Sequence, residues 1–223
     1  MKQLRFVARQ WFVGLFALTA AASVQAQYCG LFFSEYAEGS ASNKYVEIYN
    51  PTDQGIALDG YTAALYSNGS VTLSGSYALS GTLGAGEVLV VANTGADATI
   101  LAAADVLSNS FANWNGNDAV ALLDPQGNVV DVVGEIGTDS PWPVADGDTQ
   151  NNTLVRAASV TAGTADWSTG ATQWTVLPSN DWSDLDAHTF AGWCGAAPDE
   201  PFTLRIFHNN DGESALLDVD HFA

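Results

Sequence analysis

The residues best suited to chemistry lie near the end of the chain, in the stretch HNNDGES (208–214). Asp211 and Glu213 follow an apolar segment, FTLRIF, whose strand would hold both carboxylates close together. Carboxylate oxygens suit Mn²⁺, Mg²⁺ or Ca²⁺, and a pair of such ions can activate water for hydrolysis. Asp211 and Glu213 are therefore candidate metal ligands. His208 would either contact these ligands without binding the metal itself or serve as a structural residue. Few residues follow them, so we expect the site to be incomplete.

A second candidate metal site lies in the polar loop PWPVADGDTQNN (141–152). Asp146 and Asp148 have the alternating spacing of oxygen ligands that Ca²⁺ favours. The loop lacks the central glycine and the distal glutamate of an EF-hand. Asp146 and Asp148 are thus candidate calcium ligands, and the alternative is a solvated acidic loop.

No catalytic residue is identified between residues 27 and 195. His188 is the one histidine there, and we interpret it as a structural, hydrogen-bonding residue rather than a base. The segment has no G-x-S-x-G elbow, phosphate-binding glycine motif or H-E-x-x-H motif. We therefore expect the chain as it stands to be non-catalytic.

The first 26 residues have the features of a secretory signal peptide. Lys2, Arg5 and Arg9 form a basic start, an apolar run follows, and small residues precede a cleavage point after Ala26. The apolar run is too short to span a bilayer comfortably, which takes about 20 residues, and no later segment is apolar enough. We expect a secreted or extracellular protein, with the periplasm and the cell surface as further locations.

The charge of the chain excludes one class of partner. It has 25 acidic and six basic residues, and after cleavage only Lys44, Arg156 and Arg205 remain basic. Nucleic-acid affinity depends on Lys and Arg displacing counterions, so we expect no direct nucleic-acid binding. The acidic surface serves solubility, or some of its carboxylates hold Ca²⁺.

Cys29 and Cys194 are the two cysteines of the chain. In an exported protein such a pair indicates a disulfide, and closing so long a loop would stabilise the fold by roughly 4–5 kcal/mol. The alternative is two buried free thiols.

Short β-rich runs separated by Gly, Asn, Asp and Ser predict the elements that must position these residues. KYVEIYN and EVLVVAN read as strands, ATILAAADVL as a short helix, GYTAALYSNGSVTLSG as a hairpin turning at 67–69, and DAVALLDPQGNVVDVVG as a hairpin turning at 125–128. In KYVEIYN, Val46 and Ile48 are expected in the core, and Glu47 on the opposite face or paired at a sheet edge. The pattern favours an all-β fold, an Ig-like β-sandwich, with a small closed barrel as the alternative.

Tryptophans offer one further candidate surface. Aromatic side chains form sugar- or peptide-binding platforms but more often fill a core, and we expect core positions for Trp174 and Trp193. Trp114 and Trp142 fall in predicted loops, so for these two both a core position and a place in a binding platform remain open. The six tryptophans of the main segment are Trp114, Trp142, Trp167, Trp174, Trp182 and Trp193.

Several stretches together resemble the lamin-tail domain in its bacterial secreted form, over roughly residues 29–192. They are LFFSEYAEGSASNKYVEIYNPT, LDGYTAALYSNG, WNGNDAVALLDPQGNVVDVVGEIG, NTLVRAASVT and WTVLPSNDWSDLDAHTF. The resemblance implies an Ig-like β-sandwich without shared catalytic residues. It also implies a tethering or recognition module that accompanies secreted nucleases, phosphoesterases and other hydrolases.

The tail FTLRIFHNNDGES is similar to the first strand and loop of the 5′-nucleotidase-type metallophosphoesterases. Asp211 matches the aspartate of their Asp-x-His pair, while Glu213 stands in place of the histidine. With GAAPDEP as a linker, the expected layout is a signal peptide (1–26), a sandwich (27–195), a linker (196–201) and the truncated start of a phosphoesterase-like domain (202–223), which adds a short C-terminal strand.

Three functions follow from these observations. The first is a secreted, non-catalytic lamin-tail-like binding or tethering module, a fragment or accessory of an extracellular hydrolase, whose partner is a protein, an envelope or a polysaccharide surface. The second is a metal-dependent extracellular phosphoesterase using Mn²⁺ or Mg²⁺. The third is a Ca²⁺-dependent adhesion or carbohydrate-binding module.

Overall fold

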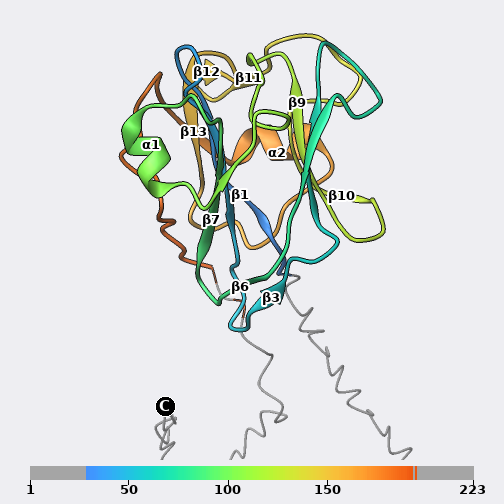
Figure 1. The fold of residues 1–223 in the computed structure, drawn as a ribbon, viewed down its shortest axis with the longest axis vertical. Helices are drawn as coiled ribbons and strands as arrows, with labels where there is room; N and C mark the ends of the chain where they lie inside the picture. Colours follow the sequence, from blue (N-terminus) through green and yellow to red (C-terminus); the bar gives the residue numbers. More distant parts are fainter. Residues whose placement is uncertain (1–28, 193, 195–223) are drawn as a thin grey trace, which may run out of the picture.

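The fold begins with an antiparallel hairpin of β1 (Phe32–Glu38) and β2 (Lys44–Tyr49), two strands rich in aromatic and β-branched residues. A computed structural model describes residues 29–192 and 194 (Figure 1). In it, this hairpin forms the centre of a six-stranded sheet. In spatial order the strands of this first sheet are β14 (Trp174–Pro178), β13 (Asn152–Arg156), β1, β2, β7 (Val88–Ala92) and β8 (Val106–Leu107).

A second, four-stranded sheet packs against the first. Its strands in spatial order are β10 (Val129–Val133), β9 (Ala119–Leu123), β4 (Thr62–Tyr66) and β5 (Gly75–Ala78). Two short ribbons complete the strands: β3 (Ile56–Ala57) with β6 (Thr82–Leu83), and β11 (Pro143–Val144) with β12 (Gly147–Asp148). Only the β7–β8 pairing is parallel among the pairings of the described residues. The predicted all-β, Ig-like sandwich is confirmed.

The core lies between the two sheets. Val46 and Ile48 of β2 meet Leu65 of β4 and Val120 and Leu122 of β9 in one buried cluster. Burial of such side chains is worth about 25 cal/mol per Å² of apolar area, which makes this cluster the main source of stability.

An ion pair also joins the two sheets. Arg156 of β13 contacts Asp131 of β10, and neither side chain is exposed to solvent. The Phe33 backbone N–H donates to Asp131 Oδ2 at 2.8 Å, and Arg156 Nε donates to the Phe33 carbonyl oxygen at 2.9 Å. The strand pairing shifts in register at Phe33 and again before Asp131. Bulges re-aim local groups, and here they bring the polar groups of both strands to one point.

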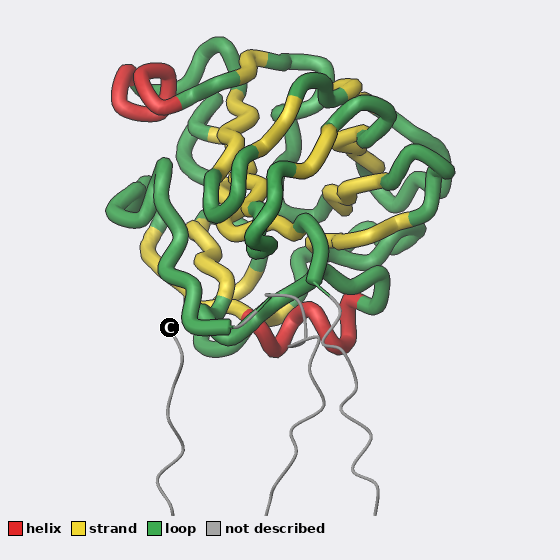
Figure 2. The backbone as a smooth tube through the Cα atoms, turned by 90° about the horizontal axis from the view of Figure 1, so that it is seen from below, coloured by secondary structure: helices red, strands yellow, loops and turns green. Residues whose placement is uncertain are grey.

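Helices are few in the described part of the chain. The predicted short helix is present as α1 (Ala98–Ala103), which lies on the outer side of the first sheet (Figure 1). A second helix, α2 (Trp167–Gly170), continues into the 3₁₀ turn η1 (Ala171–Gln173). The two helices occupy separate parts of the surface (Figure 2). Within residues 29–192 and 194, no helix has the length and apolar character needed to cross a membrane.

The chain after β14 covers the outer face of the first sheet. We call residues 179–192 the C-terminal strap. Trp182 and Leu185 of the strap pack against buried residues of β1, β2 and β7, while Phe190 packs against Tyr49. The Ala191 backbone N–H donates to the Ala158 carbonyl oxygen at 2.8 Å. Both faces of the hairpin β1–β2 are therefore buried.

Two expectations about strands need correction. The hairpin predicted over 60–75 is formed by β4 and β5, but the second strand starts at Gly75. The segment predicted as that strand is a loop in which Val71 is 74% exposed, because its apolar residues find no facing sheet. Glu47 does lie opposite Val46 and Ile48, yet it is fully buried, because the C-terminal strap covers its face.

Candidate ligand-binding cavity

A cavity of about 360 Å³ opens where β10 ends and α2 begins. One wall comes from β10 and the turn after it and carries both apolar residues and Glu135, and the other wall comes from the start of α2. Its lining residues are Val132, Gly134, Glu135, Ile136, Ala165, Asp166, Trp167 and Ser168. A volume above about 300 Å³ lies at the lower end of the range of small-ligand sites.

Gly134 shapes the floor of this cavity. It follows β10 directly and has a φ of +86°, a conformation that side chains with a Cβ rarely adopt. A Cβ at this position would lie 2.4 Å from Cζ3 of Trp142. Trp142 in turn meets Trp167 edge to face, with ring centroids 6.4 Å apart. Gly134 thus allows two aromatic rings to pack at the end of β10 and support the cavity.

Asp166 fixes the position of Trp167. As the N-cap of α2, its Oδ1 accepts a hydrogen bond from the Ser168 backbone N–H at 2.9 Å, and its Oδ2 accepts one from Thr169 Oγ1 at 2.9 Å. The hydrogen bond from the Ser168 hydroxyl, followed by that from Thr169, lowers the pKa of the Asp166 carboxyl. Asp166 therefore stays ionised beside the indole ring of Trp167.

The formal charges on the described surface are almost all negative. Lys44 and Arg156 are the only lysine and arginine among residues 29–192 and 194. Lys44 is buried against Glu38, and Arg156 is buried against Asp131. Consequently no lysine or arginine of the described part of the chain neutralises the carboxylates of Glu135 and Asp166 from the surface.

A second acidic pair lies under the C-terminal strap. Glu35 and Glu47 face each other across β1 and β2, and their exposed fractions are 1% and 0%. Tyr45 Oη donates to Glu35 Oε1 at 2.6 Å, and the Asp186 backbone N–H donates to Glu47 Oε2 at 2.8 Å. Burial raises the pKa of Glu35 to about 8 and that of Glu47 to about 7. This pair holds protons near neutral pH but has no solvent access.

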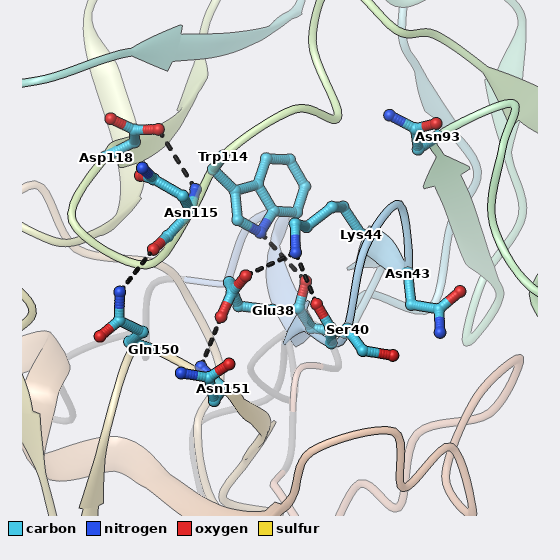
Figure 3. Close-up of polar contacts among 12 residues, drawn as sticks. Glu38, Ser40, Asn43, Lys44, Asn93, Trp114, Asn115, Asp118, Gln150 and Asn151 are labelled. Atoms are coloured by element: carbon cyan, nitrogen blue, oxygen red, sulfur yellow. Dashed lines mark hydrogen bonds and ion pairs between the residues drawn. The ribbon is translucent and has the colours of Figure 1, made fainter.

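One end of the sandwich carries a satisfied polar network (Figure 3). Lys44 Nζ donates to Glu38 Oε1 at 2.5 Å, while Glu38 Oε2 accepts the Asn151 backbone N–H at 2.5 Å. Trp114 Nε1 donates to the Ala37 carbonyl oxygen at 3.0 Å. These contacts tie the β1–β2 loop to the loops before β9 and β13, so we interpret the network as structural.

Of the predicted calcium residues, Asp146 lies in the turn between β11 and β12, and Asp148 lies on β12. Asp146 is exposed between β11 and β12, and Asp148 Oδ1 accepts the Gln150 backbone N–H at 2.8 Å. Over residues 29–192 and 194, no group of three or more His, Cys, Asp or Glu side chains is arranged to hold a metal ion. The calcium site stays a prediction, which a Ca²⁺-dependent rise in melting temperature would test.

Of the other predicted sites, the structure describes the disulfide but not the terminal metal ligands. The structure contains the predicted disulfide between Cys29 and Cys194, whose Cα atoms are 5.8 Å apart. Asp211 and Glu213 lie outside the described residues, as does the proposed linker at 196–201.

The tryptophans that the structure describes at the predicted positions are buried. Trp174 is buried, as expected, and Trp114 and Trp142 are also core residues, with exposed fractions of 1% and 7%, while Trp193 lies outside the described residues.

His188 is structural but not through hydrogen bonds. Its ring packs edge-on against Phe32 and Tyr49, and neither ring nitrogen has a partner among the described residues. That part of the expectation was wrong, because the strap presses the ring onto aromatic side chains.

Sequence reasoning missed the cavity because its walls come from segments about 30 residues apart. Trp167 is one of six tryptophans in the main segment, and Glu135 is one of many acidic residues. A local signal did exist: Asp-Trp-Ser-Thr at 166–169 is an N-cap pattern. It places Trp167 at the first position of a helix, beside an ionised carboxylate.

Comparison with known proteins adds one match. A model of the family described as Lamin Tail Domain matches residues 25–137, which spans β1 to β10 and the turn carrying Gly134 and Glu135. The comparison gives no evidence for a phosphoesterase domain after this match. No curated protein matches the chain significantly.

Proposed function

The chain belongs to the lamin tail domain family, and from this premise we propose that it is a secreted, non-catalytic recognition module that binds its ligand beside Trp167. The observation that carries the proposal is the cavity between β10 and α2, with a partly buried indole and two carboxylates in its wall. A concave site with an apolar wall and a few convergent polar groups is the usual form of a ligand site.

Export supports this function. The first 26 residues have the composition of a signal peptide, and the Cys29–Cys194 disulfide is a bond that persists in oxidising compartments. A crosslinked sandwich tolerates such an environment, since the bond limits the unfolded chain.

The proposed layout also fits a positioning role. The disulfide brings the beginning and the end of the sandwich together, with Cα atoms 5.8 Å apart. Residues 196–201 would then act as a linker, and the segment from 202 onward would lead into a phosphoesterase-like domain. In this arrangement the cavity holds the partner, and the linker holds the hydrolase nearby.

The proposal is tested on the purified chain after signal removal, residues 27–223. Ligands of three classes are titrated, namely basic peptides, acidic peptides and neutral oligosaccharides, and the indole N–H signals are followed by NMR. The Trp167 signal is the one lost in Trp167→Phe. We expect at least one class to shift this signal in a saturable manner.

Two results would contradict the proposal. One is the absence of any shift at Trp167 with all three classes. The other is turnover of nucleotide monophosphates or DNA by this chain with Mn²⁺ or Mg²⁺, because a non-catalytic module has no such activity.

A further inference from the structure

We propose that the cavity beside Trp167 takes a guanidinium group, and that the partner is a protein presenting an exposed arginine in a basic segment. This inference rests on the proposed function, since it names the ligand class of the same site. It is carried by the combination of Glu135, Asp166 and Trp167 in the lining of one cavity.

The lining matches the parts of an arginine side chain. A guanidinium stacks on an indole face through cation–π attraction and binds carboxylates through several parallel hydrogen bonds. Trp167 supplies the indole, and Glu135 and Asp166 supply the carboxylates. Val132 and Ile136 add aliphatic surface suited to the methylene groups of arginine, which pack on apolar side chains.

The same fold already holds one guanidinium in this way. The Cζ atom of Arg156 lies 3.8 Å from the centroid of the Trp174 ring, while the guanidinium is paired with Asp131. In the core, then, one indole and one carboxylate accommodate an arginine. The cavity repeats this combination at the surface, with a second carboxylate and without an arginine from the described part of the chain.

Charge favours a cation over a neutral ligand. Both Lys44 and Arg156 are buried in ion pairs, so the formal charges on the described surface are those of carboxylates. Such a surface attracts cationic partners and repels anionic ones. A neutral sugar would desolvate Glu135 and Asp166 without supplying an opposite charge, which is costly.

The test compares two ligands that differ in charge alone. N-acetylarginine amide and N-acetylcitrulline amide have nearly the same shape, but citrulline replaces the guanidinium with a neutral urea group. Each is titrated into residues 27–223 while the Trp167 indole signal is followed. We expect the arginine ligand to bind at Trp167 at least about tenfold more tightly, as for a charge-assisted hydrogen bond. Its affinity should fall as salt is raised.

Matched charge variants separate a local contact from the general field. Glu135→Gln removes one carboxylate of the cavity, and Asp53→Asn removes an exposed carboxylate outside it. Both positions are exposed, so neither change should affect folding. We expect Glu135→Gln to weaken arginine binding about three- to tenfold and Asp53→Asn to change it by less than about twofold.

The outcomes distinguish the two proposals. Equal binding of arginine and citrulline at Trp167, tighter binding of a neutral oligosaccharide there, or equal effects of Glu135→Gln and Asp53→Asn would overturn the arginine assignment while leaving a recognition site. Absence of any ligand effect at Trp167 would overturn the recognition function itself and the arginine assignment with it.

Discussion

Glu35 lies directly opposite Glu47 on the neighbouring strand, and both carboxyl groups are buried beneath the C-terminal strap. Burial is the largest cause of their raised pKa values, about 8 and about 7. Hydrogen bonds from Tyr45 and Ser34 act in the opposite direction, but they do not offset the cost of removing the charges from water. The strap therefore closes over a pair that is protonated in the folded protein.

The first prediction is a loss of stability as pH rises above neutral. Between the ordinary glutamate pKa of 4.5 and the folded values of about 8 and 7, the folded state binds more protons than the unfolded state. The contribution of Glu35 and Glu47 is thus fully present below pH 4.5 and is lost as pH rises through about 7 and 8.

His188 has the opposite effect in a lower window. Burial lowers its pKa from 6.5 to about 4, so its titration adds stability as pH rises between these values. The effect of Glu35 and Glu47 is therefore clearest above pH 6.5. We expect the free energy of unfolding in urea to fall by on the order of 2 kcal/mol between pH 6.5 and 8.5. Glu35→Gln should remove most of this fall, and an unchanged slope in that variant would refute the assignment.

The second prediction concerns the buried ion pair. Asp131→Asn leaves the guanidinium of Arg156 uncompensated inside the sandwich, which costs about 3–5 kcal/mol. Urea unfolding measures this loss, and the double variant Asp131→Leu with Arg156→Met should recover a large part of it. As a control, Asp53→Asn at the surface should change stability by less than about 0.5 kcal/mol. A loss below about 1 kcal/mol in Asp131→Asn would show that the pair is not needed.

The third prediction concerns the crosslink. Replacing Cys29 and Cys194 by serine opens a loop with a sequence separation of 165 residues. Stability should fall by up to about 4–5 kcal/mol, while the far-UV circular dichroism of the folded protein stays the same because the strand pairings do not depend on the bond. Thermal melts with and without reductant check this directly. Identical melting temperatures would mean that the disulfide has no effect on stability.

The fourth prediction separates backbone strain from a steric clash. Gly127 and Gly134 have similar φ values, +82° and +86°, but a Cβ at Gly127 meets nothing within 4 Å, while one at Gly134 meets Trp142. Gly127→Ala should cost about 1–2 kcal/mol for the backbone alone. Gly134→Ala should cost about 1–3 kcal/mol more, as in overpacked cores, and should weaken ligand binding at Trp167. Equal losses in urea unfolding would show that the Trp142 ring moves aside freely.

Much of the sandwich could be predicted from local patterns. The turn at 125–128 and the apolar runs on either side of it predict β9 and β10 correctly. The strap could not be predicted, because it has no periodic pattern and is held over β1–β2 by tertiary contacts such as the packing of Trp182 and the hydrogen bond from Asp186 to Glu47. For the same reason the sequence did not predict that Glu47 is buried, since only the strap covers the face of β2 on which it lies.

The candidate site was predictable only in its parts. The N-cap of α2 is readable from Asp166 and the residues after it. That Glu135 shares a cavity with Trp167 depends on the packing of α2 beside the end of β10, which no local pattern specifies. The spacing of Asp146 and Asp148 suggested a site more strongly, yet the described structure places them in the turn before β12 and on β12 itself, with no third ligand among the described residues.

The most direct measurement is a crystal structure of residues 27–223 with N-acetylarginine amide. The account predicts electron density for a guanidinium stacked on the Trp167 indole, within hydrogen-bonding distance of Glu135 and Asp166. An arginine ligand bound at another surface, with the cavity beside Trp167 filled by water alone, would contradict it.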